Sequence, residues 1–166
     1  MSAELRAALD TIAATPAVLR ALSVGVPGAV AETPLDGGWS PKDVVAHLSI
    51  SEDFGSIGRL RRVVAEDAPL LPSYDETREL ERSGLRGVPL AELLARFERQ
   101  RAEDVAWLRA LPLGAYERAG RHEEVGAVTG AELIFQCAYH DHLHLEQLAR
   151  MLRASFEPLR GPLRVF

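Results

Sequence analysis

Apolar residues recur at intervals near 3.6 along four stretches of the chain, and this spacing predicts four long α-helices. The first runs from about Ala3 to Ser23, with a kink or restart expected at Thr15-Pro16 and Thr15 as its cap. The others run from Pro41 to about Ala65, from near Pro89 to about Ala110, and from Thr129 to about Ser155. Helices with one apolar and one polar face predict an all-α fold, a four-helix bundle.

Two of these helices begin at recognisable capping sequences. Ser40 suits the N-cap, Pro41 the first helical position, and Asp43 lies three residues after the cap. Thr129 and Glu132 repeat the spacing of a capping box. Both helix starts are therefore well defined by local chemistry.

The connecting segments are rich in Gly and Pro, which predicts irregular backbone. We expect loops at residues 25–39 and 118–128, and a tail beyond residue 155 that is not regular helix. Residues 66–88 are long for a loop, contain a short predicted helix near residues 76–82, and are placed to cover a site as a lid.

Size and composition fit one domain spanning residues 1–166, because 47% of the chain is hydrophobic and 26% is charged. The net charge of −5 argues against nucleic acid as a partner. No run of 18 uncharged apolar residues is present, so we expect no membrane span. Cys137 is the only cysteine, which excludes an intrachain disulfide and favours a reducing, cytoplasmic location.

Histidines are the most distinctive chemistry in the chain. His140 and His144 are four residues apart and therefore share one helix face, whereas His142 points away. The helix face that carries His140 and His144 is otherwise apolar. His47 lies on the apolar stripe of its own helix. Buried imidazoles are either hydrogen-bonded core residues or ligands of a shared cation, and His122, in a charged segment, is expected to be exposed.

Two segments resemble sequence signatures of the DinB-like (YfiT-like) superfamily. Residues 39–48 (WSPKDVVAHL) resemble its W-S-x-x-[DE]-[VI]-[VIL]-x-H-L signature, and residues 140–147 (HDHLHLEQ) resemble its H-x-x-x-H-x-x-Q segment. Residues 128–133 (VTGAEL) are also similar to the family. The resemblance implies a four-helix bundle, often a homodimer, that binds one divalent metal ion through His47, His140 and His144.

Three neutral histidines leave at least one coordination position open, which is typical of catalytic sites and compatible with Zn, Ni, Fe or Mn. The resemblance implies thiol-dependent S-transferases and isomerases among the family's branches. We expect a metal-dependent hydrolase or a thiol-dependent S-transferase, which activates water or a low-molecular-weight thiol toward a small-molecule substrate. The alternatives are a non-enzymatic metal-binding bundle and a metal-free interaction module. No catalytic residue beyond the metal ligands is assigned.

The neighbours of the histidines allow two interpretations each. Asp141 either orients His144 or is a solvated or interhelical acid, and Gln147 either lines the site or packs between helices. Glu52 is five residues after His47, a poor helical spacing, and is expected at the surface.

Other candidates have simple structural interpretations. Cys137 is expected to be a small apolar filler, although it can also act as a nucleophile or fourth ligand. Ser51 either contacts substrate or permits close packing, and Trp39 is expected to close the end of the bundle. The arginines at positions 59, 61 and 62 are expected on a solvated helix face rather than in an anion site.

Overall fold

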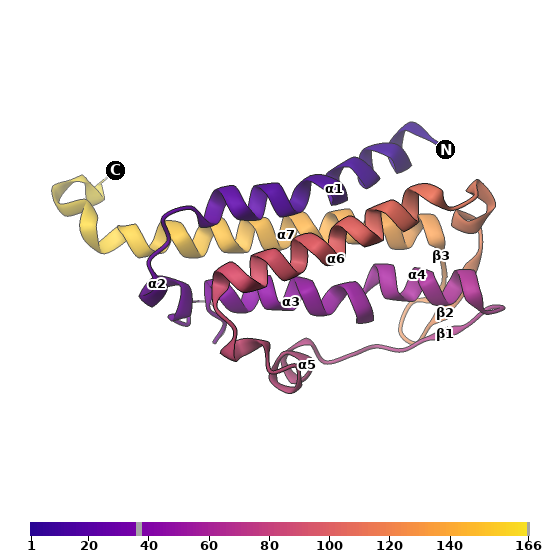
Figure 1. Cartoon of the computed structure of the whole chain (residues 1–166), viewed down its shortest axis with the longest axis horizontal. Helices are drawn as coiled ribbons and strands as arrows, with labels where there is room; N and C mark the ends of the chain where they lie inside the picture. Colours follow the sequence, from indigo (N-terminus) through magenta and orange to yellow (C-terminus); the bar gives the residue numbers. More distant parts are fainter. Residues whose placement is uncertain (36–37, 166) are drawn as a thin grey trace.

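The computed structural model describes residues 1–35 and 38–165, and long helices dominate it (Figure 1). The predicted four-helix bundle is confirmed. Its members are α1 (Ala3–Ser23), α3 (Pro41–Phe54) continued by α4 (Ser56–Ala65), α6 (Leu90–Ala110) and α7 (Gly130–Phe156). α1 packs against α6 and α7, and α3 packs against α6 and α7.

The bundle interior contains two apolar clusters separated along the helices. One cluster contains residues from the first halves of α1 and α7, from α4 and from the end of α6. The other uses α3, the start of α6 and the second half of α7. Between them lie buried polar side chains, which we call the polar layer: Thr15, Glu52, Arg101 and Asp141.

Both predicted capping boxes are present. Ser40 Oγ accepts a hydrogen bond from the Asp43 backbone, and the Asp43 carboxylate accepts one from the Ser40 backbone at 2.9 Å. Thr129 and Glu132 form the same reciprocal pair at the start of α7. These caps satisfy backbone groups at the two helix starts that precede the histidines.

Of the kink or restart expected in the first helix at Thr15-Pro16, the restart is wrong, because α1 is continuous from Ala3 to Ser23 with Pro16 inside it. Thr15 does not cap a helix. Its hydroxyl lies 2.6 Å from a carboxylate oxygen of Asp141. Tertiary contacts therefore hold the helix together across the proline, although proline removes one backbone hydrogen bond.

The second predicted helix is interrupted, because Gly55 leaves the helical region and separates α3 from α4. At Gly58 a Cβ atom would lie 1.8 Å from the Asp53 carbonyl oxygen, so the chain passes too close for any side chain. Phe54, the last residue of α3, is 48% exposed.

Residues 118–128 do not form the expected loop. They contain β2 (Ala119–His122) and β3 (Gly126–Thr129), which pair antiparallel through a turn at Gly126, whose φ is +84°. β1 (Leu70–Leu71) adds a parallel third strand. Pairing with a distant segment fixes this small sheet, and local periodicity does not reveal such pairing.

The remaining connections contain short helices. Residues 25–39 include α2 (Gly28–Glu32), which corrects the predicted loop, and positions 36–37 lie outside the described residues. The short helix expected near residues 76–82 is confirmed as α5 (Glu76–Arg82). Three 3₁₀ segments complete the description: η1 (Leu85–Gly87), η2 (Leu113–Tyr116) and η3 (Glu157–Val165).

The tail is not regular α-helix, as predicted: η3 bends at Gly161, where φ is +54°. Throughout the described part of the chain, no helix combines the length and the apolar character needed to cross a membrane.

Candidate metal centre

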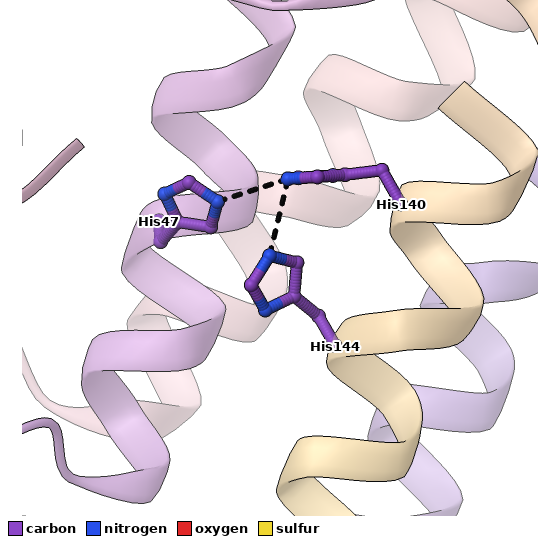
Figure 2. Close-up of side chains that lie close together, drawn as sticks. All are labelled: His47, His140 and His144. Atoms are coloured by element: carbon purple, nitrogen blue, oxygen red, sulfur yellow. Dashed lines mark hydrogen bonds between the residues drawn. The ribbon is translucent and has the colours of Figure 1, made fainter. Parts of the chain in front are cut away.

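Three histidine side chains meet between α3 and α7 (Figure 2). His47 comes from α3, and His140 and His144 come from successive turns of α7. The Nε2 atom of His140 lies 3.1 Å from the Nε2 atom of His47 and 3.1 Å from that of His144. One ring nitrogen from each residue falls within 4.8 Å of the other two, so the helical spacing and the cross-helix packing bring all three together.

Burial keeps these rings neutral. His47 is fully buried, His144 is buried and His140 is half-buried. Loss of solvent and the neighbouring histidines lower the pKa of His47 to about 2, and loss of solvent and His144 lower that of His140 to about 4. Burial also lowers the pKa of His144. Neutral imidazoles offer the lone pairs that a metal ion needs.

The far sides of the rings show how they are oriented. Nδ1 of His144 lies 2.8 Å from the side-chain oxygen of Gln147, which only accepts, so Nδ1 carries the proton and Nε2 keeps a lone pair. Gln147 therefore orients the His144 ring. The indole of Trp39 lies 4.9 Å from the His47 ring and stacks 6.3 Å from the His144 ring, measured between centroids.

The geometry of the cluster fits a metal ion better than a set of hydrogen bonds. A neutral imidazole has only one N–H. The Nε2 lone pair of His144 faces Nε2 of His140, and this same His140 nitrogen also faces Nε2 of His47. Around a tetrahedral zinc ion with Zn–N bonds of about 2.0–2.1 Å, neighbouring nitrogens are about 3.3 Å apart. The two separations that involve His140, 3.1 Å each, are close to that value, and all three nitrogens lie within 4.8 Å of one another.

The polar layer lies directly beside the histidines. The Arg101 guanidinium donates to both oxygens of Glu52 at 2.9 and 2.7 Å and to both oxygens of Asp141 at 2.5 and 3.1 Å. Burial acts to lower the pKa of Arg101, but the two carboxylates raise it well above its ordinary value, so the guanidinium stays charged. Arg101 thereby joins α6 to α3 and α7, the two helices that supply the histidines.

Two expectations about acidic neighbours are settled by this layer. Glu52 is only 5% exposed, so its predicted surface location is wrong: α3 is buried on all sides from Asp43 to Glu52, and the Arg101 guanidinium pairs with the Glu52 carboxylate. Asp141 is the interhelical acid of the two interpretations, because it binds Arg101 and Thr15.

A cavity of about 230 Å³ adjoins the cluster and has His140 in its wall. Ser51, Arg59 and Tyr74 line it, so Ser51 does face the site and Arg59 is not simply solvated. His122 also lines the cavity and is half-buried, which corrects its expected exposure; the β2–β3 hairpin carries it there. The other two arginines of the group pair with acids: Arg61 with Asp104 and Arg62 with Glu66.

Cys137 reaches the same cavity wall but is only 6% exposed. Burial raises the pKa of its thiol well above the ordinary value, so the thiolate that a nucleophile or ligand requires is disfavoured. The side chain packs in the apolar cluster around Leu133 and Ile134. The structure therefore agrees with the filler interpretation.

Two residues of this region, Arg101 and Tyr74, were not predicted from the sequence to belong to the site. Arg101 follows Phe97 by one turn on the buried face of its helix, and a charged residue at such a position is a recognisable sign of a buried ion pair. Tyr74 lies in a connecting segment without periodicity, and no sequence signal marks it.

Comparison with known proteins places this geometry in context. The family model of the DinB superfamily matches residues 8–148. A structure described as "YfiT from Bacillus subtilis is a probable metal-dependent hydrolase with an unusual four-helix bundle topology" is similar with a TM-score of 0.82 and 23% identity, covering 93% of this chain and 90% of that one. The structure of a mycothiol-dependent maleylpyruvate isomerase is similar with a TM-score of 0.65 and 16% identity, covering 87% of this chain and 60% of that one. None of the curated proteins matches the sequence.

Proposed function

We propose that this chain, which belongs to the DinB superfamily, binds one divalent metal ion through His47, His140 and His144 and is a metal-dependent enzyme. The nucleophile is water or a low-molecular-weight thiol, and the substrate is a small molecule. The observation that carries the proposal is the convergence of three neutral, largely buried imidazoles beside a polar cavity.

The number of protein ligands supports a catalytic rather than a structural ion. Structural zinc sites usually have four protein ligands, whereas catalytic sites have three and an open position. In the described part of the chain, the cluster contains the three histidines alone. Asp141, the nearest acid in sequence, is occupied by Arg101. The cavity at His140 provides space for a nucleophile and a substrate.

The protein side chains supply orientation and exclusion of water. Gln147 holds the His144 proton on Nδ1, which directs the Nε2 lone pair toward the other two histidines. Arg101 holds α3 and α7 together immediately beside the cluster. A divalent ion bound there would act as a Lewis acid and lower the pKa of a coordinated water or thiol.

Both nucleophiles have support among similar proteins. The description of YfiT as a probable metal-dependent hydrolase favours water, and the mycothiol dependence of the isomerase favours a thiol. The cavity accommodates either, because its wall contains hydroxyl, imidazole and charged groups rather than a purely apolar surface.

Metal quantification tests the proposal directly. Protein purified without a histidine tag and dialysed against zinc, nickel, iron or manganese is analysed by mass spectrometry of the metals. We expect one equivalent per chain in the wild type. The matched variants are His47→Ala, which removes the cross-helix ligand, and His142→Ala, which removes an exposed histidine between the two ligands on α7.

His142→Ala should bind metal as the wild type does. Loss of a ligand's hydrogen-bonding partner lowers metal affinity about 10–100-fold. His47→Ala removes a ligand itself and should lower the affinity by more. Equal metal content in both variants, or none in the wild type, contradicts the metal site. A metal-loaded protein that is stabilised but turns over neither hydrolysable esters and amides nor thiol–electrophile pairs supports the non-enzymatic alternative.

A further inference from the structure

Hydrogen-bond donors gather in one part of the cavity wall, next to the histidines. The Ser51 hydroxyl lies 3.2 Å from the Tyr74 hydroxyl and 3.3 Å from Nε2 of His47. The Arg59 guanidinium carbon lies 5.7 Å from the centre of the Tyr74 ring. Ser51, Arg59 and Tyr74 all line the cavity; we call them the donor subsite.

The donor subsite has capacity that the protein does not use. Arg59 donates to the backbone oxygen of Pro72 at 2.8 Å, and the structure of residues 1–35 and 38–165 shows no ion pair for it. Ser51 contacts the same His47 nitrogen that a metal ion would occupy. When that lone pair is engaged, the Ser51 hydroxyl loses an acceptor and its hydrogen is available to a ligand.

We propose that Ser51, Arg59 and Tyr74 bind a carboxylate, so that the substrate is a small monocarboxylate whose reacting group lies toward the histidines. A guanidinium and two hydroxyls can donate several hydrogen bonds to one carboxylate, and a guanidinium also supplies the opposite charge. This inference rests on the proposed function only in placing the reacting group of the substrate toward the histidines. The carboxylate subsite itself depends only on the three side chains.

The charges around the cavity set an upper limit on the charge of the ligand. Glu76 and Glu124 also line it. Glu124 acts on Arg59 electrostatically, although within the described residues no salt bridge joins either glutamate to Arg59. Glu124 accepts a hydrogen bond from the Ser73 hydroxyl at 2.7 Å, which fixes its place in the wall. Two nearby carboxylates repel a dianion more strongly than a monoanion, so the cavity favours a carboxylate over a phosphate.

The β2–β3 hairpin places Tyr74. The backbone N–H of Ser73 donates a hydrogen bond to the Glu123 carboxylate at 2.9 Å, and the Ser73 hydroxyl donates one to the Glu124 carboxylate. The Tyr74 ring then packs against Phe54 with centroids 5.8 Å apart. Contacts from the hairpin and from Phe54 therefore hold the tyrosine hydroxyl over the cavity. Its position does not depend on helical structure in its own segment.

Titration by ¹H–¹⁵N NMR tests the subsite. Zinc-loaded and metal-free protein are titrated with butyrate, and separately with inorganic phosphate, at constant ionic strength. We expect saturable butyrate shifts at the amides of Tyr74 and of Gln136, which also lines the cavity, and a weaker response to phosphate. Arg59→Gln and Tyr74→Phe should each raise the butyrate Kd about tenfold, the effect of losing one strong hydrogen bond.

The controls remove the same groups elsewhere. Arg62→Gln changes an arginine of the same helix that pairs with Glu66, and Tyr139→Phe changes an exposed tyrosine of α7. Each should alter the butyrate Kd by less than twofold. The inference is overturned if Arg62→Gln weakens butyrate as much as Arg59→Gln does, if phosphate binds as tightly as butyrate, or if butyrate gives no saturable shift.

The same samples separate this inference from the proposed function. Arg59→Gln and Tyr74→Phe should retain one zinc per chain; loss of zinc from either would show that it acts through the metal site and would overturn the subsite. If the wild type takes up no zinc, the proposed function fails, whereas Arg59-dependent binding of butyrate to the metal-free protein still supports the carboxylate subsite.

Discussion

Replacing Arg101 by Met is the sharpest test of the polar layer. Arg101 is 2% exposed and binds Glu52 and Asp141, which are 5% and 0% exposed. Its removal leaves two buried carboxylates without a countercharge, and breaking a buried ion pair in this way costs about 3–5 kcal/mol. With an unfolding entropy of about 2.1 cal/mol/K per residue, the melting temperature of a chain of 166 residues should fall by about 9–14 °C.

The pH dependence of the variant distinguishes lost charge compensation from lost packing. Burial raises the pKa of Glu52 above its unfolded value, and the Arg101 guanidinium opposes that rise, so removing Arg101 should raise the Glu52 pKa further. The folded variant then holds more protons than the unfolded chain, so its stability falls as pH rises above about 4.3, by up to about 1.4 kcal/mol per pH unit for the Glu52 carboxyl. Urea denaturation of Arg101→Met should therefore show a smaller loss, relative to wild type, at pH 5 than at pH 8.

Arg109→Met provides the matched control, because Arg109 lies on the same helix and its ion pair with Asp10 is exposed. This variant should change the free energy of unfolding by less than about 1 kcal/mol. Equal losses in the two variants, or a loss in Arg101→Met that is the same at pH 5 and pH 8, would refute the argument that Arg101 compensates buried charge.

Three further predictions follow from particular contacts. In metal-free protein, pKa values of about 2 for His47 and about 4 for His140 mean that the unfolded chain takes up protons below about pH 6.5 before the folded one does, so stability should fall from pH 6.5 toward pH 4. Two such groups contribute up to about 2.7 kcal/mol per pH unit, and a flat urea-denaturation profile in this range would contradict neutral buried rings. Gln147→Ala should weaken zinc binding about 10–100-fold in a competition titration with a chelator dye, and unchanged affinity would show that its contact with His144 has no orienting effect. Gly58→Ala should lower the melting temperature markedly, because its Cβ would lie 1.8 Å from a carbonyl oxygen, whereas Gly114→Ala, with nothing within 4 Å, should leave it almost unchanged.

Local patterns were sufficient to predict most of the helices. The bounds of α1 and α5 agree with the prediction, and α3 and α7 begin where the capping residues Ser40 and Thr129 placed them. Helix formation depends on neighbours within about one turn, so sequence periodicity and caps carry the relevant information. The inward direction of His47, His140 and His144 could be predicted for the same reason.

Contacts between distant segments account for the errors. The hairpin that replaces the expected loop at residues 118–128 pairs β2 with both β3 and β1, and the β1 partner lies some fifty residues earlier. Glu52 was expected at the surface because its burial depends on the other helices that surround α3 and on Arg101 from one of them. Tyr74 joins the cavity through Ser73 and the hairpin glutamates, a chain of contacts without a local signature.

The long helices, their starts and the faces on which the three histidines lie follow from local sequence, because a helix's spacing and caps are properties of adjacent residues. Long-range packing aligns α3 and α7 so that the histidine nitrogens meet, pairs Arg101 with two acids beside them, and brings Ser51, Arg59 and Tyr74 to one cavity. These arrangements depend on the relative height of packed helices and on the path of a hairpin. Both are set by the sum of many long-range contacts, which no single stretch of sequence contains.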